Sequence, residues 1–323
     1  MQDFSRRNVI IGATAAAAGF GLAGPLAIID QALAQKTAAP AKGFHTWKVG
    51  TIECTAIYDG VWEKPHDPAF IKNASVDEVK AAMKKAGLSE EFVTIPFTPL
   101  VVKTEKDLVL FDAGTGGQVQ PTAGKLAEGL KAAGIDAAKI TRVLISHFHP
   151  DHIFGLMEKG TNAQVFPNAE IVVSAAEYRF WTDPAVIEKL PEGRRPLAKR
   201  IQATFPTWKN VRQIDGEKEA APGIRVIAAP GHTPGHVAFH VSSGNAQMIY
   251  SGDTFYHPAM SLPAPQWHGA FDADGAVAEA SRRALADRLV ADKILVAGYH
   301  FPWPGAGTIA KDGTGYALTP AKA

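Results

Sequence analysis

The chain has 323 residues, of which 46% are hydrophobic and 20% charged, proportions typical of a globular enzyme. Its 33 basic and 32 acidic residues leave a formal net charge of +1, so it lacks the positive surface that nucleic acids and other polyanions require. The single cysteine excludes a disulfide framework. These values favour a folded globular protein and make nucleic acid an unlikely partner.

The first 34 residues have the features of an export signal. Arg6 and Arg7 precede an apolar stretch rich in alanine and glycine, and residues 32–34 form a small-residue cleavage pattern. The segment resembles a twin-arginine signal, which implies recognition by the twin-arginine export machinery and a periplasmic mature chain. Val9 and Ile11 stand where such signals usually carry an aromatic residue and a lysine, so general secretion stays open.

The rest of the chain is predicted to form an arm and one domain. Residues 35–46, rich in alanine, lysine and proline, are expected to be flexible, and residues 47–323 to fold as a single unit. Strand-like apolar runs alternate with helical segments, a pattern that predicts an α/β fold. The runs cover residues 108–111, 143–145, 171–173, 224–228, 247–250 and 294–297.

Two helices can be placed from local signals. Ser75 and Glu78 have the spacing of a capping box, and Gly87 offers a stop, so the sequence predicts a helix between these positions. A second helix is expected over residues 276–290.

The densest chemical signal is the sequence SHFHPDH, which follows a buried apolar strand. Residues after such a strand emerge into a loop at the sheet edge, where side chains can converge on an ion. Neutral imidazole suits zinc, and a carboxylate oxygen completes the coordination. His147 and His149 can reach one metal ion, while the adjacent Asp151 and His152 can reach a second.

Three later residues of the same chemical kind each follow another apolar strand-like run. They are His232, Asp253 and His300. Asp253, in YSGDT, is the best placed residue to bridge two ions, and the two histidines would complete the two coordination shells. The whole series therefore predicts a site for two metal ions.

These motifs carry a resemblance to a known family. The sequences HFHPDH, PGHTPGH and SGDT, together with the late His300, resemble the signature of the metallo-β-lactamase superfamily. The resemblance implies an αββα sandwich of two mixed sheets with helices outside and the metals at one edge. It also implies that small-molecule substrates are hydrolysed, and it leaves a homodimer open.

The same resemblance implies roles for individual residues. It assigns His147, His149 and His232 to the first ion, Asp151, His152 and His300 to the second, and Asp253 to both. Asp112, in LFDAG, matches the family's aspartate that supports a ligand, although it also suits a simple turn before Gly114. His236 is expected to support its loop or a ligand rather than to bind metal. Zinc is the default ion, with manganese, iron or cobalt as alternatives.

Two further residues are suggested by particular branches. The domain is similar to methyl parathion hydrolase and its relatives through HPDHIFGLM and the tail HFPWPGAGTIAKDGTGY, and Trp181 matches a pocket tryptophan there. Its alternative is a core tryptophan on an amphipathic helix. Tyr256 resembles the phenol that acyl-homoserine lactone lactonases place beside the substrate carbonyl, where it would stabilise an oxyanion. Its alternative is a buried tyrosine.

The expected reaction is hydrolysis by a hydroxide held between two metal ions. Asp253 or Asp151 would carry a proton to the leaving alkoxide, and no organic cofactor is needed. The substrate classes favoured are lactones, esters and phosphotriesters. A thioesterase of the glyoxalase II type, amide hydrolysis as in β-lactamases and a noncatalytic metal-binding protein stay open as alternatives. Oxygen reduction is disfavoured because His149 stands where flavodiiron enzymes carry a glutamate.

Overall fold

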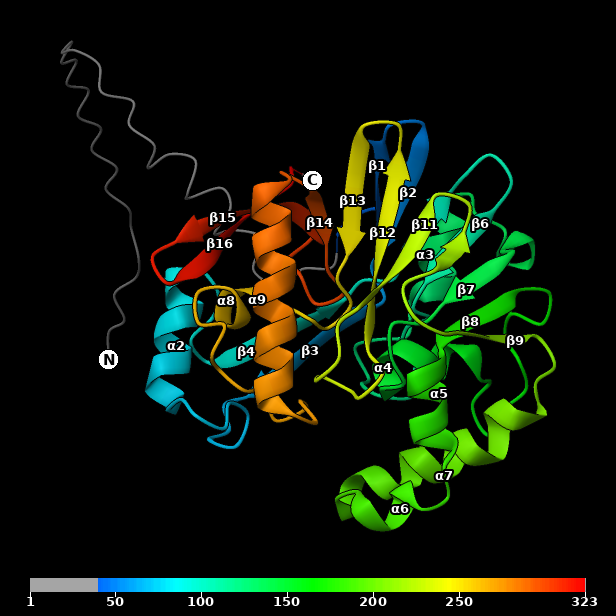
Figure 1. The fold of residues 1–323 in the computed structure, drawn as a ribbon, viewed down its shortest axis with the longest axis horizontal. Coiled ribbons are helices and arrows are strands. Elements are labelled where there is room, and N and C mark those ends of the chain that lie inside the picture. Colours follow the sequence, from blue (N-terminus) through cyan, green and yellow to red (C-terminus); the bar gives the residue numbers. More distant parts are fainter. Residues whose placement is uncertain (1–39, 323) are drawn as a thin grey trace, which may run out of the picture. The chain divides into compact units, whose positions relative to one another are not determined.

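Two seven-stranded mixed sheets form the centre of the computed structural model, which describes residues 40–322 (Figure 1). The predicted signal, residues 1–34, and residues 35–39 of the predicted arm lie outside this described range. In the described range, no helix combines the length and the hydropathy that crossing a membrane requires.

The first sheet has the strand order β1-β2-β5-β6-β7-β8-β9, antiparallel up to β6 and parallel from β6 to β9. Successive side chains of a strand face opposite sides of the sheet. In β6, Val109 and Phe111 therefore join the core between the sheets, while Leu110 faces the helices. The strands are β1 (Phe44–Val49), β2 (Ile52–Ile57), β5 (Leu100–Lys103), β6 (Leu108–Phe111), β7 (Arg142–Leu144), β8 (Glu170–Ser174) and β9 (Val211–Ile214).

The second sheet has the order β10 to β16 and is antiparallel except for the parallel pair β13 and β14. Met248 and Tyr250 of β13 face the first sheet, and Ile249 faces away from it. The strands are β10 (Glu219–Ala221), β11 (Ile224–Ala228), β12 (Val237–Ser243), β13 (Ala246–Tyr250), β14 (Leu295–Ala297), β15 (Ala306–Asp312) and β16 (Gly315–Pro320). A separate antiparallel pair joins β3 (Gly60–Pro65) to β4 (Phe92–Phe97).

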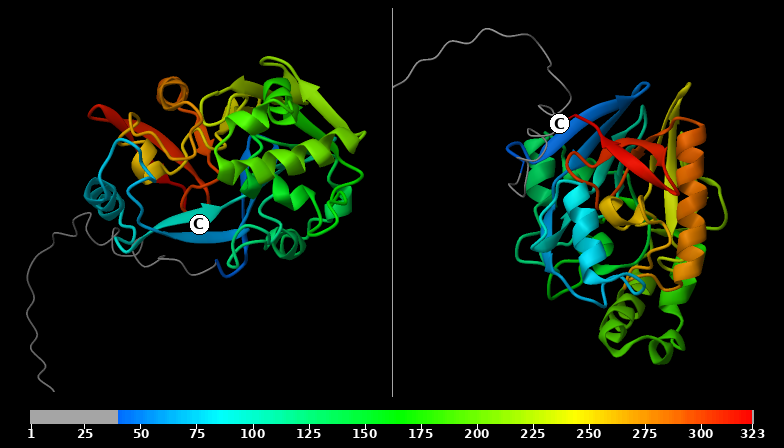
Figure 2. Two further views of the ribbon diagram at one scale, coloured as in Figure 1. Left: turned by 90° about the horizontal axis from the view of Figure 1, so that it is seen from below. Right: turned by 90° about the vertical axis from the view of Figure 1, so that its left-hand side faces the viewer.

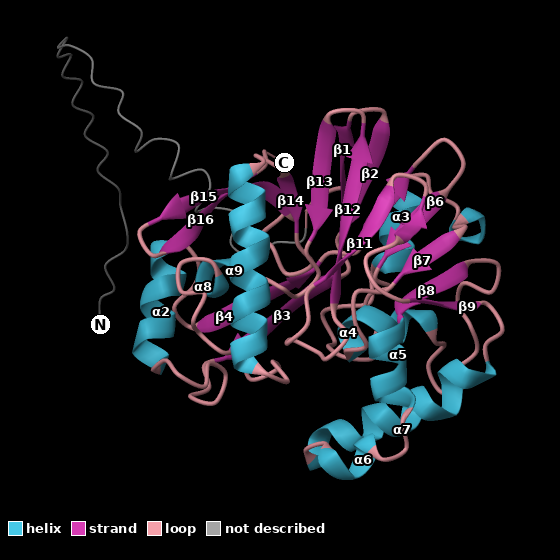
Figure 3. Cartoon of the chain, in the orientation of Figure 1, coloured by secondary structure: helices cyan, strands magenta, loops and turns pink. Residues whose placement is uncertain are grey.

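Helices cover the outer face of each sheet (Figure 3). Leu130 of α3 and Ile201 of α7 pack with Leu110 of the first sheet, whereas Leu285 and Leu289 of α9 pack with the second. Figure 2 shows α9 along one flank of the molecule. The helices are α2 (Val76–Lys85), α3 (Leu126–Ala132), α4 (Pro150–Ile153), α5 (Ala175–Thr182), α6 (Val186–Lys189), α7 (Arg195–Thr204), α8 (Pro258–Ser261) and α9 (Gly275–Ala291).

This order of layers, helix, sheet, sheet, helix, confirms the predicted αββα sandwich. All six predicted strand-like runs correspond to strands, β6, β7, β8, β11, β13 and β14, with ends that differ by at most one residue. The predicted capping box is present at the start of α2, where the Ser75 hydroxyl accepts from the amide of Glu78 and the Glu78 carboxylate accepts from the amide of Ser75.

The predicted boundary between arm and domain is wrong by three residues. Phe44, His45 and Thr46 belong to β1 and pair with the β2 residues Ile57, Ala56 and Thr55. The composition of residues 35–46 favoured a flexible segment, but the strand starts within it because β2 offers its free edge. The folded unit therefore begins before residue 47.

Candidate metal centre

The candidate ligands lie on loops that leave the ends of four strands at one edge of the two sheets. SHFHPDH follows β7, His232 follows β11, Asp253 follows β13 and His300 follows β14. Pro150 starts the single turn of α4, since its fixed φ suits the first helical position, and this turn presents Asp151 and His152 side by side. The two sheets thus deliver ligands to the same place from opposite sides.

The first group of side chains comprises His147, His149, His232 and Asp253. One ligand atom from each lies within 4.8 Å of the others, and all four side chains are buried. His149 Nδ1 is 3.0 Å from His232 Nε2, which in turn is 3.2 Å from Asp253 Oδ2. His147 Nε2 lies 3.8 Å from the same carboxylate oxygen.

The second group comprises Asp151, His152 and His300. Asp151 Oδ2 lies 3.4 Å from Nε2 of each histidine. Asp253 reaches this group as well, with Oδ1 at 3.3 Å from His152 Nε2 and Oδ2 at 3.3 Å from His300 Nε2. The carboxylate of Asp253 is therefore shared between the two groups, as a bridging ligand requires.

The inward atoms of these groups fit divalent metal ions. Among the described residues, His147 Nε2 is buried without any hydrogen-bond partner, and His152 Nε2 and Asp253 Oδ1, although 3.3 Å apart, are buried without forming a hydrogen bond. Leaving a buried polar atom without a partner costs about 1–3 kcal/mol, and a coordinated ion would remove that cost. This donor set implies divalent metal ions, because imidazole nitrogen with carboxylate oxygen is a typical set for zinc.

Electrostatics divide the histidines into two kinds. Burial lowers the pKa of His147 and His149 well below the ordinary value, with further lowering by neighbouring imidazoles, so both rings are neutral and keep a lone pair for a metal. At His152 burial also acts to lower the pKa, but the carboxylates of Asp253, Asp151 and Asp112 outweigh it and raise the pKa. A metal ion would take the place of that proton.

Outward-facing nitrogens of four ligand rings have partners that orient them. His147 Nδ1 lies 3.0 Å from Ser146 Oγ and His300 Nδ1 lies 2.8 Å from the carbonyl oxygen of Pro96. His152 Nδ1 meets Asp112 and His232 Nδ1 meets Asp272, at 2.8 Å and 2.9 Å from a carboxylate oxygen. A partner that accepts from Nδ1 leaves Nε2 free for a metal, so these contacts select the tautomer that ligation needs.

Asp112 lies in a tight turn and also contacts a candidate ligand. Its φ of +54° places it in the left-handed region that tight turns use. Its carboxylate also contacts His152, accepts from the amide and hydroxyl of Ser146, and accepts from the hydroxyl of Tyr250 at 2.8 Å. The turn therefore aims a carboxylate at a ligand and at the serine that begins SHFHPDH.

The His236 ring lies between two backbone groups next to the candidate ligands. Its Nδ1 lies 3.1 Å from the carbonyl oxygen of Ala229, and its Nε2 accepts from the backbone amide of Asp253 at 3.0 Å. Burial lowers the pKa of His236 to about 3, so the ring is neutral and able to accept this bond. His236 belongs to neither group of candidate ligands.

Trp181 and Tyr256 are both buried, at 1% and 7% exposure. Trp181 belongs to the core beneath α5 and α7, although its ring meets that of His149 edge to face at 6.4 Å. It therefore does not line an open surface of the site. The Tyr256 ring lies under the guanidinium of Arg282, and its hydroxyl donates to the carbonyl oxygen of Trp267 at 3.3 Å.

Sequence interpretation missed three buried charged residues that hold the ligand loops. Asp272 binds His232, and its other carboxylate oxygen accepts from Gly269 N and lies 3.4 Å from Arg282 Nη2. Arg282, 1% exposed on α9, also donates to the carbonyl oxygens of Thr254, Pro265 and Trp267. The third residue is Glu177 on α5, also 1% exposed. None of the three follows a motif, and no spacing relates them to the ligands they support.

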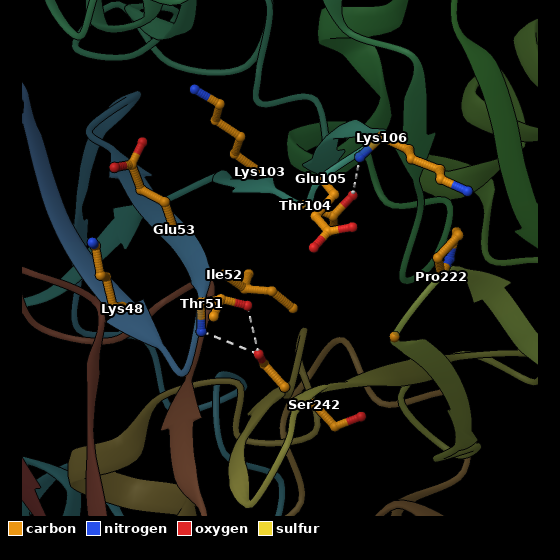
Figure 4. Close-up of a pocket in the computed structure, with 12 residues that line it drawn as sticks. Lys48, Thr51, Ile52, Glu53, Lys103, Thr104, Glu105, Lys106, Pro222 and Ser242 are labelled. Atoms are coloured by element: carbon orange, nitrogen blue, oxygen red, sulfur yellow. Dashed lines mark hydrogen bonds between the residues drawn. The ribbon is translucent and has the colours of Figure 1, made fainter.

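A polar cleft of about 530 Å³ lies at the opposite ends of the strands (Figure 4). Turns from both sheets meet there, and Thr51 hydrogen-bonds Ser243 through its amide and its hydroxyl. Its lining residues carry charges of both signs and include none of the candidate ligands: Lys48, Thr51, Ile52, Glu53, Lys103, Thr104, Glu105, Lys106, Pro222, Gly223, Ser242 and Ser243. The chemistry of the chain is therefore concentrated at the other edge.

Solved structures similar to this chain include two hydrolases. AidC, a dizinc quorum-quenching lactonase in complex with the product N-hexanoyl-L-homoserine, has a TM-score of 0.82 and 30% identity over 87% of this chain and 98% of its own. AbOPH, a hydrolase in the beta-lactamase superfamily, has a TM-score of 0.80 and 25% identity with the same coverage.

Curated relatives match over a shorter span. An N-acyl homoserine lactonase of a Bacillus species is 27% identical over 165 residues, which are 45% of this chain and 58% of that protein. A "probable metallo-hydrolase" of Mycobacterium bovis is 27% identical over 181 residues, 49% of this chain and 56% of that protein. The chain thus spans little more than half the length of these relatives.

The family assignment comes from a match that includes every candidate ligand but His300. The model of the metallo-beta-lactamase superfamily matches residues 98–298, from the end of β4 to the residues just after β14. The fold, the two groups of ligands and the similarity to AidC agree with that match. This chain belongs to the metallo-beta-lactamase superfamily.

Proposed function

We propose that the protein is a hydrolase that holds two divalent metal ions, most favourably zinc, and opens lactone rings. The single observation that carries the dinuclear site is the carboxylate of Asp253, which lies within 3.3 Å of ring nitrogens in both ligand groups. Bound at these groups, two ions would supply Lewis acidity toward the scissile carbonyl and activate a water molecule as the nucleophile.

The carboxylates of Asp253 and Asp151 have different roles in this proposal. Asp253 is the more enclosed, with 5% of its side chain exposed against 17% for Asp151. We infer that Asp253 holds the ions, while Asp151, which faces solvent more openly, passes a proton to the leaving alkoxide. The Tyr299 hydroxyl donates to the backbone carbonyl oxygen of Asp151 at 2.6 Å and so fixes that residue.

An apolar side chain at the site favours substrates that carry an apolar group, such as a lactone with an acyl chain. Phe271 is 40% exposed, and its ring lies 6.3 Å from that of His149 and 6.2 Å from that of Phe70. An exposed aromatic side chain beside a candidate ligand offers a surface on which an acyl chain would bury apolar area. Similarity to AidC, whose bound product carries a hexanoyl chain, supports the same substrate class.

Phosphotriesters and aryl esters are the second candidate class, supported by the similarity to AbOPH and by the same aromatic surface. Glutathione thioesters rank lower. The hydroxyacylglutathione hydrolase of Pseudomonas syringae is 25% identical over only 40% of its own length.

Turnover on a substrate panel tests the proposal. The zinc-loaded protein is expected to hydrolyse N-decanoyl homoserine lactone with a higher kcat/KM than the butanoyl analogue, an aryl ester, methyl parathion, a glutathione thioester or a β-lactam. A chelator should abolish the activity and added zinc should restore it, because the ions would activate the water molecule that attacks the substrate. Two bound metals with silence on every substrate would refute the proposed substrate class.

The variant Phe271→Ala tests the chain-length preference, and Val277→Ala, at an equally exposed apolar residue on α9, is its control. Losing the aromatic surface should lower kcat/KM for the decanoyl substrate about tenfold relative to the butanoyl one, as expected for the loss of roughly 1.4 kcal/mol of apolar contact. Val277→Ala should leave the ratio unchanged.

Metal content tests the shared role of Asp253. In Asp253→Ala, at least one of the two ions is expected to be lost on dialysis and turnover to fall by orders of magnitude, because both groups lose a ligand. Metal analysis by mass spectrometry measures this directly. Asp287→Ala, at an exposed carboxylate that contacts Lys311, is the control. Full metal content with normal activity in Asp253→Ala would disprove bridging.

The Tyr256 hydroxyl now donates a long hydrogen bond to the carbonyl oxygen of Trp267. We propose that it gives up this bond when substrate binds and donates a hydrogen bond to the substrate carbonyl oxygen instead. Burial raises the pKa of Tyr256, which keeps the hydroxyl protonated as a donor. Tyr256→Phe should therefore lower kcat on lactones about tenfold to hundredfold with little change in metal content. Tyr316→Phe, at the distant contact with Asp287, is the matched control. Unchanged lactone turnover in Tyr256→Phe would leave Tyr256 a packing residue.

Export to the periplasm through the twin-arginine route is proposed from Arg6, Arg7 and the apolar stretch after them. The mature chain is expected to begin near Gln35, and N-terminal sequencing of protein recovered from the periplasm measures this. Replacing both arginines by lysine should retain the protein in the cytoplasm. Export of that variant at the normal level would favour general secretion.

A further inference from the structure

Glu177 places a carboxylate in the interior behind the first group of ligands. It belongs to the first turn of α5, which follows β8, and its side chain is buried. Four donors contact it: Oε1 accepts from the amide of Phe148 at 2.9 Å and the indole of Trp181 at 2.8 Å, and Oε2 accepts from the hydroxyl of Thr233 at 2.7 Å and the amide of Gly235 at 2.9 Å. These donors fill the acceptor sites of an ionised carboxylate.

Three of these four donors lie next to histidines of the site. Phe148 stands between His147 and His149, Thr233 directly follows His232, and Gly235 directly precedes His236. The carboxylate thus ties the loop after β7 to the loop after β11, and these two loops carry all three histidines of the first group. Within the described range, Glu177 accepts no hydrogen bond from the side chains of the second group.

The loop PGHTPGH packs closely against the starts of two helices. A Cβ atom on Gly235 would lie 2.0 Å from the backbone nitrogen of Glu177, and one on Gly231 would lie 2.1 Å from the backbone nitrogen of Ala278 on α9. Only glycine permits such close approach of one backbone to another. The loop therefore lies directly against α5 and α9, and the Glu177 carboxylate joins it to the SHFHPDH loop.

The separation of the two loops sets the geometry of the first group. His149 Nδ1 and His232 Nε2, one from each loop, are 3.0 Å apart. Ligand nitrogens of a tetrahedral zinc ion lie further apart, at about 3.3–3.4 Å for bonds of 2.0–2.1 Å. The two loops must therefore already lie at nearly the correct spacing for an ion to bind. Small shifts in that spacing change the affinity of the site for the ion.

We propose that Glu177 is a positioning residue that fixes the spacing of the SHFHPDH and PGHTPGH loops and thereby sets the metal affinity of the first group, and not of the second. This inference rests on the proposed two-metal function only for the identity of the ligand, a divalent ion. Glu177 itself contacts no inward-facing ligand atom and takes no part in the reaction.

Zinc titration of single-site backgrounds tests the inference without using activity. In full-length His300→Ala, one zinc ion should bind at the first group, and in His149→Ala one should bind at the second. Adding Glu177→Gln places the glutamine NH₂ group against groups that are themselves hydrogen-bond donors, so the bonds between the two loops are weakened. In the first background, zinc affinity should therefore fall about 10–100-fold, the range for residues that support ligands. In the second background the affinity should not change.

Asp59→Asn is the matched control. Asp59 is equally buried and accepts from the amide and hydroxyl of Thr115 and the amide of Leu126, none of which adjoins a ligand. It should leave first-group affinity at the wild-type value. If it weakened zinc binding as much as Glu177→Gln does, a general loosening would account for both effects and the inference would fail.

Two further outcomes separate this inference from the proposed function. Unchanged first-group affinity in Glu177→Gln would overturn the inference alone, whereas two backgrounds that bind no zinc at all would count against the metal site itself. If Glu177→Gln does not fold, Thr233→Val removes one donor and keeps the carboxylate. It should weaken first-group binding in the same direction, and the absorption spectrum of bound Co²⁺ in that variant should shift as the ligand geometry changes. No weakening and no shift would overturn the inference.

Discussion

The central constraint on this molecule is that seven imidazole and carboxylate side chains meet, mostly buried, at one edge of the sheets with their inner atoms turned toward one another. Contacts between the carboxylates and His152, His232 and His300 hold part of this cluster together. Several inner atoms, however, have no hydrogen-bond partner among the described residues, and buried polar atoms without partners are costly. The site therefore does not assemble from its inner contacts alone. Its geometry depends on bonds made by the outer faces of the ligands, and the buried polar groups around the site serve those bonds.

The residues that bond to the outer faces of the ligands come from different parts of the fold. Asp112 extends from the end of β6, where a left-handed turn aims its carboxylate at His152. Asp272 precedes α9 and is held by Arg282, whose guanidinium also fastens the segment from Thr254 to Trp267. The core between the sheets thus determines where the strands end, and buried charged groups determine where the ligands point.

Much of this architecture could be predicted from the sequence because it depends on local patterns. Apolar runs marked the central strands, and Ser75 with Glu78 marked the start of α2. The candidate ligands were recognisable because histidine and aspartate followed strands in an ordered series, a combination that rarely arises by chance. Residues whose chemistry and place in the chain agree can be interpreted without a structure.

Asp272, Glu177 and Arg282 could not be predicted because no motif marks them and their partners are distant in sequence. Asp272 lies 40 positions from His232, and Glu177 lies 56 positions from Thr233. A glutamate in the first turn of a helix ordinarily serves a helix terminus in solvent, and Arg282 in α9 has the pattern of a surface charge. Only the packing of α5 and α9 against the ligand loops shows that both are buried. The start of β1 was missed for the same reason, because its pairing partner lies further along the chain.

Each ligand group combines residues from both sheets: His147, His149, Asp151 and His152 follow a strand of the first, and His232, Asp253 and His300 follow strands of the second. An ion in either group would act as a cross-link that closes a long loop in the chain, and such closure restricts the unfolded state. Ion binding would thus require that the two halves of the sandwich have already docked. Metal occupancy would then report the completion of folding, and an exported chain that carried its ions would leave the cytoplasm with both halves joined.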